Sequence, residues 1–182
     1  MAITFQQVTE FNTADFEYLF SQSLPFFKPG GNFEFPVGIE TDIEKKDFLA
    51  KLISDFMSSA AGAFSYAAYD DDLITSLVIG QMSPIAPGTL NAIWLLAGPN
   101  KAGTRNWMYE SDTVKARHEF LADHGIDQFT ITATDTSKIL TNMEGSPGFE
   151  LVGDKVVETK VIPDVELTNP TMVKITVKVL PV

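Results

Sequence analysis

The chain has 182 residues, of which 45% are hydrophobic and 20% charged, a composition typical of a globular protein long enough for one domain with a full core. Its formal charge is −11, from 24 acidic against 13 basic residues, and the basic residues are not clustered, so we expect no nucleic-acid partner. The absence of cysteine excludes disulfides, thiolate catalysis and cysteine-based metal sites.

The sequence offers no membrane segment and no export signal. No apolar stretch approaches the roughly 20 residues that cross a bilayer, and Met1–Gln6 lacks the basic and apolar regions of a signal peptide. We therefore expect a single domain over residues 1–182, with no membrane contact, that stays in the cytoplasm or is packaged there into a particle. The acidic surface either keeps the protein soluble or attracts a basic substrate such as an amine.

The first third of the chain predicts a strand, two helices and a loop rich in aromatic rings. Ile3–Val8 alternates like a strand, and Asn12–Asp15 supplies the N-cap of a short helix that Pro25 closes. Glycine and proline prevent a regular element in Phe26–Ile39, so its phenylalanines are either pinned beneath the domain or exposed as a substrate lid or protein contact. Thr41–Glu44 is a capping box that opens a second helix with apolar residues at helical spacing.

Three strands follow. Ala63–Tyr69 and Leu73–Met82 form a predicted hairpin, and Thr89–Ala97 comes after a second turn. We expect these strands to be sequential antiparallel neighbours because both connections are short. The hairpin link, Asp70–Asp72, is either a solvated turn or a cation site, and the turn is favoured because consecutive residues point in different directions.

A glycine-bearing loop then joins the third of these strands to a helix. Gly98-Pro99 ends the strand, Asn100–Arg105 forms the loop, and a helical pattern runs over Asn106–His124 until Gly125. Such a junction directs backbone N–H groups and the positive end of a helix dipole at one spot, which suits a phosphate, although ordinary turns share the pattern. The helix shows two candidate apolar faces, one with Thr113, Ala116 and Phe120 and one with Val114 and Leu121. Its histidines, His118 and His124, fall on different faces, so we expect no metal site.

The remaining elements complete a sheet of six or seven strands. Asp127–Thr134 reads as a strand, Ser137–Glu144 as a short helix, and Gly148–Gly153 opens another strand. Lys155–Ile162 and Met172–Leu180 are further strands, the second with alternating buried and wet residues.

This order of elements resembles the GNAT (acyl-CoA N-acyltransferase) superfamily. There the fourth strand leads into a pyrophosphate loop of pattern Gln/Arg-x-x-Gly-x-Gly/Ala, and a later short helix ends in Tyr-x-x-x-Gly-Phe. Here the loop starts at Asn100, its first glycine matches at Gly103, Arg105 takes the place of the second small residue, and Gly148-Phe149 is preceded by Glu144 where the family often carries tyrosine.

The resemblance implies an α+β fold with a mixed, mostly antiparallel central sheet flanked by helices. It implies acetyl-CoA or another acyl-CoA as cofactor, no metal, and a V-shaped opening for pantetheine between Leu95–Ala97 and Phe129–Ile131. The residues that would bind the cofactor are Lys101, Ala102, Gly103, Thr104, Arg105 and Asn106.

The catalytic residues stay unassigned. Family members often use a glutamate on the fourth strand as base and a tyrosine on the short helix as acid, and this sequence has neither in place. The substitutes that the sequence offers are Tyr66, Tyr69, Tyr109, Asp70 and Glu110. Because Arg105 and Glu144 depart from the pattern, we expect CoA binding to be weak or absent.

Two function classes remain open. One is an acyl-CoA-dependent N-acyltransferase with a diverged site, in which positioning carries most of the catalysis. The other is a non-catalytic GNAT-like scaffold, a structural or assembly component resembling small acidic proteins of tailed phages, with a homo-oligomer or larger assembly as its context. A third interpretation is an α+β domain outside the family with a chance match.

Overall fold

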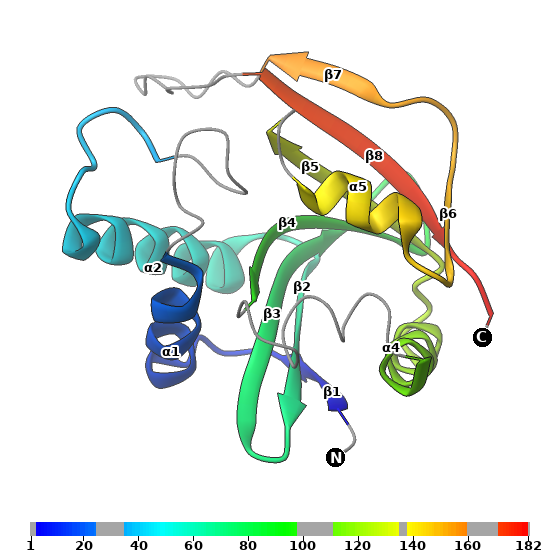
Figure 1. Ribbon diagram of the computed structural model, residues 1–182, viewed down its shortest axis with the longest axis horizontal. Helices are drawn as coiled ribbons and strands as arrows, with labels where there is room; N and C mark the ends of the chain where they lie inside the picture. The colour runs from blue at the N-terminus through cyan, green and yellow to red at the C-terminus, as the bar shows by residue number, and fades with distance from the viewer. Residues whose placement is uncertain (1–2, 25–34, 98–110, 135–137, 160–170, 182) are drawn as a thin grey trace.

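The computed structural model describes residues 3–24, 35–97, 111–134, 138–159 and 171–181 (Figure 1). The described strands form one eight-stranded sheet of order β1-β2-β3-β4-β5-β8-β6, with β7 also paired to β8. The strands are β1 (Ile3–Val8), β2 (Ala63–Asp70), β3 (Leu73–Met82), β4 (Thr89–Ala97), β5 (Gln128–Thr134), β6 (Phe149–Leu151), β7 (Val156–Thr159) and β8 (Thr171–Val179). The described helices are α1 (Thr13–Ser23), α2 (Asp42–Ser59), α4 (Ser111–Asp123) and α5 (Lys138–Gly145).

The predicted fold class is confirmed. The sheet is mixed and mostly antiparallel, because only β4 and β5 pair in parallel among the described strands. The expected run of sequential antiparallel neighbours, β2, β3 and β4, is also confirmed. The sheet has eight strands where we expected six or seven, because two short strands, β6 and β7, lie one after the other along β8.

Local capping signals set the starts of the first two helices. Asn12 Oδ1 accepts a hydrogen bond from the Asp15 backbone N–H (2.9 Å) at the start of α1. At α2 the Glu44 N–H donates to Thr41 Oγ1 (3.2 Å), and the Thr41 N–H donates to Glu44 Oε2 (2.9 Å). These bonds hold the pKa of the Glu44 carboxyl below its usual range. Both sequence-predicted caps are therefore confirmed.

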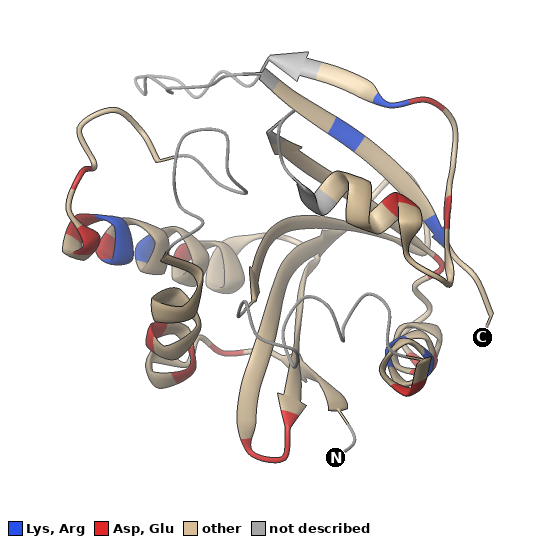
Figure 2. Ribbon diagram, viewed as in Figure 1, with Lys and Arg blue, Asp and Glu red and all other residues tan. Residues whose placement is uncertain are grey.

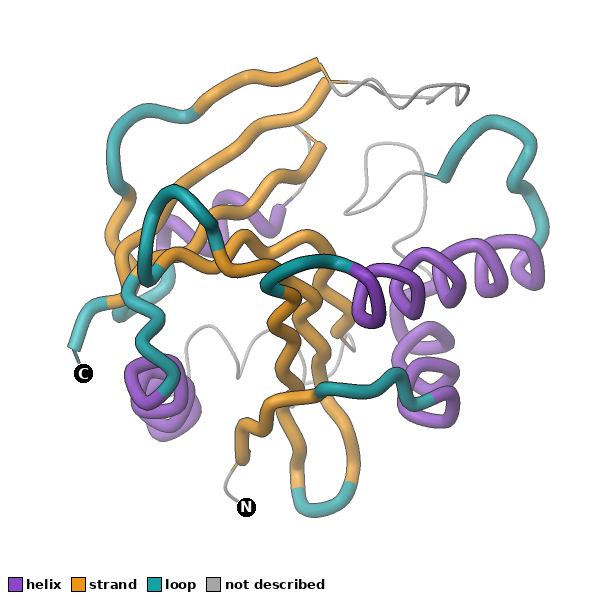
Figure 3. Tube along the Cα trace, turned by 180° about the vertical axis from the view of Figure 1, so that it is seen from behind, coloured by secondary structure: helices purple, strands orange, loops and turns teal. Residues whose placement is uncertain are grey.

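Two apolar cores lie on opposite faces of the sheet, and Figure 3 shows the helices on either side of it. The α4–α5 core is the larger, and its buried members include Tyr66, Leu121, Phe129, Met143, Phe149 and Ile175. The α1–α2 core is smaller, and its buried members include Phe16, Leu19, Leu49, Ile53, Ile79 and Leu96. The sheet thus has helices on both sides, with α1 and α2 on one and α4 and α5 on the other.

Acidic residues are spread over α1, α2 and the β2–β3 turn, whereas β8 carries lysines (Figure 2). The turn itself is a solvated one, because Asp71 and Asp72 are exposed. Within the described ranges no group of three potential metal-ligating side chains comes together. None of the helices in those ranges is both long enough and apolar enough to cross a membrane.

Candidate functional site

The strands β4 and β5 separate after four residue pairs. Their parallel pairing runs from Thr89↔Gln128 to Ala92↔Ile131 and then stops. Near the end of this ladder Thr130 Oγ1 donates a hydrogen bond to Asn91 Oδ1 (2.5 Å). Beyond it, the described part of β4 pairs only with β3, and β5 only with β8. Figure 1 shows the two strands diverging toward their C-terminal ends. This interruption of the strand pairing, between Ile93–Ala97 of β4 and Thr132–Thr134 of β5, is called the gap below.

A β-bulge in β4 explains why the strands separate. Opposite β3, Gly80 pairs with Ala92 and Ile79 with Trp94, so Ile93 is one extra residue. Bulges bend a strand and increase its twist, and this one falls directly after the last pair with β5. Gly80 permits the close approach at this point, because a Cβ there would lie 2.9 Å from the Asn91 carbonyl oxygen.

The bulge also changes the side-chain alternation of β4. Before it, Leu90 and Ala92 contact the α4–α5 core. After it, Trp94 and Leu96 belong to the α1–α2 core. Because successive side chains on a strand point to opposite faces, one extra residue exchanges the faces of everything that follows.

The far end of β4 is held on the α1–α2 side. The Trp94 ring packs edge-on against Phe56 of α2, with ring centroids 5.6 Å apart and planes at 90°. The hydroxyl of Ser23, at the end of α1, donates to the Ala97 carbonyl (3.1 Å). These contacts keep the second half of β4 away from β5.

The sequence predicted this gap only on the β4 side. Leu95–Ala97 does face it, as expected. Phe129–Ile131 does not, because these residues are paired with Leu90–Ala92. The gap instead faces Thr132–Thr134, because the β4–β5 pairing continues through Ala92↔Ile131 and stops only at the bulge at Ile93.

Comparisons with known proteins find no match for the sequence but several matches for the structure. No family model and no curated protein matches the sequence. The structure matches a protein assigned to the GNAT family of acetyltransferases from Desulfovibrio desulfuricans, with a TM-score of 0.58, 14% identity and 100% of both chains covered. It also matches the ribosomal-protein-S18-alanine N-acetyltransferase from Escherichia coli, with a TM-score of 0.53, 8% identity, and 98% of this chain and 94% of that one covered.

A third match is the Bacillus subtilis acetyltransferase in complex with CoA, with a TM-score of 0.52, 13% identity, and 98% and 99% of the two chains covered. The chain has the GNAT fold. The likeness spans essentially the whole chain, and at these identities it establishes the fold alone.

Several sequence-predicted site residues of this GNAT fold lie outside the described residues. They are Lys101, Ala102, Gly103, Thr104, Arg105, Asn106, Tyr109 and Glu110. Of the aromatic loop Phe26–Ile39, the structure describes residues 35–39. Phe35 is buried and packs against Phe48 of α2, with ring centroids 6.1 Å apart. This ring is therefore pinned beneath the domain, which was one of the two alternatives.

The described catalytic substitutes do not meet at the gap. Tyr66 is fully buried, its hydroxyl has no hydrogen-bond partner among the described residues, and burial raises its pKa well above the usual value. Tyr69 donates to Asp15 Oδ2 (3.2 Å), and burial followed by the Asp15 charge raises its pKa. Asp70 ends β2, so β3 and β4 separate it from β5. All three residues lie on β2, so β3 and β4 come between them and β5 in the strand order.

Glu144 is the residue that, by the sequence resemblance, takes the place at which the family often carries a general-acid tyrosine. Its Oε1 is 2.9 Å from Lys155 Nζ in an ion pair that joins α5 to the segment before β7. The contact directs the Glu144 carboxyl group at Lys155.

The structure brings together one group of side chains that sequence reasoning missed. Arg117 is fully buried on α4, its guanidinium lies 4.3 Å from the Phe149 ring centre, and its Nη2 donates to His118 Nε2 (2.9 Å). His118 Nδ1 donates in turn to the Leu180 carbonyl (2.6 Å). Burial first, and then the Arg117 charge, lowers the pKa of His118 to about 4, so the ring is neutral at pH 7. Burial also lowers the pKa of Arg117, to about 10.

This cluster explains the Gly148-Phe149 pair found in the sequence. Gly148 has φ +85°, and a Cβ there would lie 2.5 Å from His118 Cε1. The Phe149 ring stacks against the Arg117 guanidinium in a cation–π contact. The pair thus anchors α4 and the end of β8 to the start of β6, on the α4–α5 side of the sheet.

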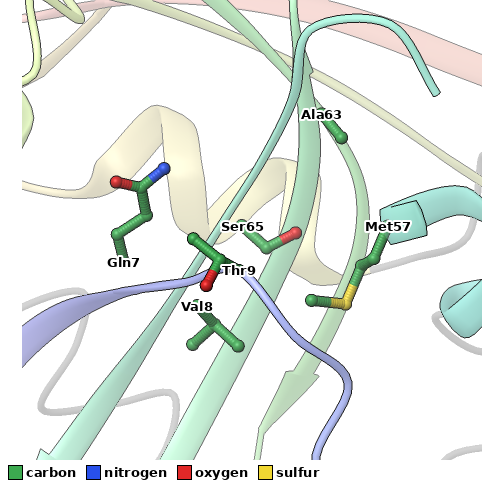
Figure 4. A pocket seen from close by; sticks show the side chains of 6 residues that line it. All are labelled: Gln7, Val8, Thr9, Met57, Ala63 and Ser65. Atoms are coloured by element: carbon green, nitrogen blue, oxygen red, sulfur yellow. The ribbon is translucent and has the colours of Figure 1, made fainter. Parts of the chain in front are cut away.

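A small cavity lies elsewhere, between β1, β2 and the end of α2. Its volume is about 90 Å³, and Ser65, whose buried hydroxyl has no hydrogen-bond partner in the described structure, faces it together with Met57 (Figure 4). The cavity is lined by Gln7, Val8, Thr9, Met57, Ala63 and Ser65. It has room for water but falls well below the roughly 300 Å³ of small-molecule sites, so it is not a site for a cofactor.

Proposed function

We propose that this protein binds an acyl-CoA in the gap between β4 and β5. The observation that carries the proposal is the end of the β4–β5 ladder at Ala92↔Ile131, directly before the bulge at Ile93. The edge of Ile93–Ala97 that faces β5 has no strand partner among the described residues. Backbone groups there require another partner, and an extended ligand with amide groups, such as pantetheine, supplies one.

The length of the Ile93–Ala97 edge suits an extended pantetheine chain. Five residues at about 3.3 Å each give roughly 16 Å of strand along which pantetheine can lie. The thioester would then sit near the bulge and the pyrophosphate near the end of β4. Residues 101–106 follow β4 and precede α4, so we assign the pyrophosphate to the backbone N–H groups of this loop, with Lys101 and Arg105 adding positive charge. The departures at Arg105 and Glu144 argued for weak binding, and the gap is the reason that we propose binding nonetheless.

The reaction that this arrangement supports is N-acyl transfer. The nitrogen of an amine attacks the thioester carbonyl, the carbon–sulfur bond breaks, and the thiolate of CoA leaves while the amine proton passes to solvent. The described residues of β4 and β5 include no carboxylate that could take this proton. Rate acceleration would therefore come from holding the two reactants together, and the net charge of −11 favours a cationic acceptor.

Calorimetric titration with acetyl-CoA tests the proposal. We expect saturable binding by the unmodified protein and its loss in Gly103→Val, because a branched side chain blocks close approach of the phosphates. S-acetylpantetheine is the matched control ligand: it lacks the pyrophosphate, so its weaker binding in the gap should be the same in both proteins. Absence of saturable binding of acetyl-CoA to the unmodified protein would refute the proposal.

A second candidate is a non-catalytic GNAT-like scaffold, for example a component of a phage particle. The ion pair between Glu144 and Lys155 favours this scaffold, because by the sequence resemblance Glu144 takes the place where an enzyme would carry its general acid. This candidate predicts no acetyl transfer from acetyl-CoA to a panel of polyamines and lysine peptides, whether or not the cofactor binds.

A further inference from the structure

The strands β5 and β8 present a polar face on the α1–α2 side of the sheet. Phe129, Ile131 and Ala133 of β5 belong to the α4–α5 core, as do their partners on β8. Because side chains alternate along a strand, the residues between them point to the other side. The strand residues of the α1–α2 core come from β1 to β4, so this core does not extend over β5 and β8 in the described structure. We call this side of β5 and β8 the open face, and its half-buried or exposed residues include Thr130, Thr132, Lys174, Thr176 and Lys178.

Lys174 lies one strand away from the gap. Thr132 is the first β5 residue beyond the β4–β5 ladder, and it pairs with Lys174 of β8. Directly paired residues of antiparallel strands share a face, so both side chains are on the open face. Neighbouring strands lie about 4.8 Å apart, a distance that the four-carbon stem of a lysine can span. The Lys174 ammonium group can therefore reach a molecule that lies over the gap on this face.

No acidic side chain balances Lys174 in the described structure. Its neighbours on the open face are uncharged: Thr132 and Val156 across the two strand pairs, and Met172 and Thr176 along β8. Four other lysines of the described ranges form ion pairs with carboxylates, whereas Lys174 forms none with a described residue. A half-buried ammonium group beside hydroxyls, without a carboxylate of the protein, is suited to bind the carboxylate of a ligand.

We propose that Lys174 binds the carboxylate of the acyl acceptor, which makes the acceptor an amino acid rather than a simple amine. This inference rests on the proposed acyl-CoA site in the gap. On the opposite face Leu95, Ile131 and Ala133 pack into the α4–α5 core, so the acceptor reaches the thioester from the open face. One ammonium group balances the single charge of a carboxylate, whereas a phosphate carries more charge.

The carboxylate takes no part in the chemical step. The amino-acid nitrogen bonds to the acyl carbon and loses a proton, the carbon–sulfur bond breaks, and the sulfur gains a proton, which gives an N-acyl amino acid and the CoA thiol. Charge selects the acceptor at two distances. The net charge of −11 attracts an ammonium group from solution, whereas Lys174 acts at contact and selects an amine that also carries an anion. A polyamine has no anion and would be repelled by Lys174.

Paired acceptors test this inference. Release of the CoA thiol from acetyl-CoA is measured with a series of amino acids and with the carboxamide of each, which has nearly the same shape and lacks the negative charge. We expect kcat/KM for the best amino acid to exceed that of its carboxamide by about tenfold or more. Lys174→Gln should reduce this ratio to about one, mainly through KM, and Lys174→Arg should keep most of it. Lys178→Gln, on the same face further along β8, is the matched control and should leave the ratio unchanged.

Calorimetric titration with acetyl-CoA separates this inference from the proposed function. Lys174→Gln should bind acetyl-CoA as the unmodified protein does, because Lys174 contacts the acceptor and not the cofactor. If the unmodified protein does not bind acetyl-CoA, the proposed function fails and this inference fails with it. If it binds acetyl-CoA but acetylates no amino acid, acts equally on the carboxamides, or keeps its preference in Lys174→Gln, this inference alone is overturned.

Discussion

Replacing Gly148 by alanine should destabilise the fold far more than its size suggests. Gly148 adopts φ +85°, and the added Cβ would lie 2.5 Å from Cε1 and 3.1 Å from Nε2 of His118. The imidazole cannot move aside cheaply, because it is buried and hydrogen-bonded on both nitrogens, to Arg117 and to the Leu180 carbonyl. The substitution therefore forces the ring out of both bonds.

The expected loss can be summed from these contacts. An alanine in the left-handed region costs about 1–2 kcal/mol. A lost neutral hydrogen bond costs about 1 kcal/mol, and one to a charged group, here the Arg117 guanidinium, about 1.5–3 kcal/mol. The free energy of unfolding should therefore fall by about 3.5–6 kcal/mol, a large part of the roughly 5–15 kcal/mol that a domain possesses.

Urea unfolding at pH 7 measures this loss, with Gly125→Ala as the control. Gly125 has φ +70°, but a Cβ there meets nothing within 4 Å, so only the backbone term of about 1–2 kcal/mol should remain. A second measurement repeats Gly148→Ala in a His118→Ala background, where the clash is gone and the cost should likewise fall to the backbone term. An equal cost of Gly148→Ala in both backgrounds would refute the reasoning.

Three further outcomes are expected. His118 is neutral in the folded state with a pKa of about 4, against about 6.5 when unfolded. The unfolded chain therefore binds the extra proton between these values, and stability that is complete above about pH 6.5 should fall by up to about 3 kcal/mol as the pH drops toward 4. Urea unfolding across this range should show the slope, and His118→Gln should flatten it. Thr41→Ala removes the cap of α2 and should cost about 1 kcal/mol in the same assay at pH 7, whereas Thr13→Ala, outside any cap bond, should change little. Tyr66→Phe deletes a buried hydroxyl without a hydrogen-bond partner in the described structure, so it should be neutral or stabilising, and a loss above about 1 kcal/mol would contradict this.

Local signals made much of the fold predictable. The Thr41–Glu44 capping box and the short connections between β2, β3 and β4 each act within a few residues, so the sequence displays them directly. The bulge at Ile93 has no such signature, because one extra residue in an apolar run looks like any other. The β5 side of the gap was therefore misplaced.

The orientation of α4 escaped prediction for a different reason. Its buried face includes Arg117 and His118 beside Val114 and Leu121. A pattern of apolar residues cannot reveal a face that contains a buried cation, since such a group is tolerated only by partners from distant parts of the chain, here Phe149 and Leu180 through His118. The choice between two apolar faces was thus left open by the sequence.

The four-pair ladder between β4 and β5 divides the sheet into two antiparallel halves. Few backbone hydrogen bonds join the two halves across this ladder, so side chains of the α4–α5 core supply most of the contact between them in the described structure. One example is Tyr66 of β2, whose ring packs edge-on against Phe129 of β5 with ring centroids 6.3 Å apart. Apolar packing weakens on cooling, whereas the antiparallel ladders within each half depend on it less. Amide hydrogen exchange at Thr89–Ala92 and Gln128–Ile131 should therefore report a partial opening, easier than global unfolding, that grows relatively more frequent in the cold.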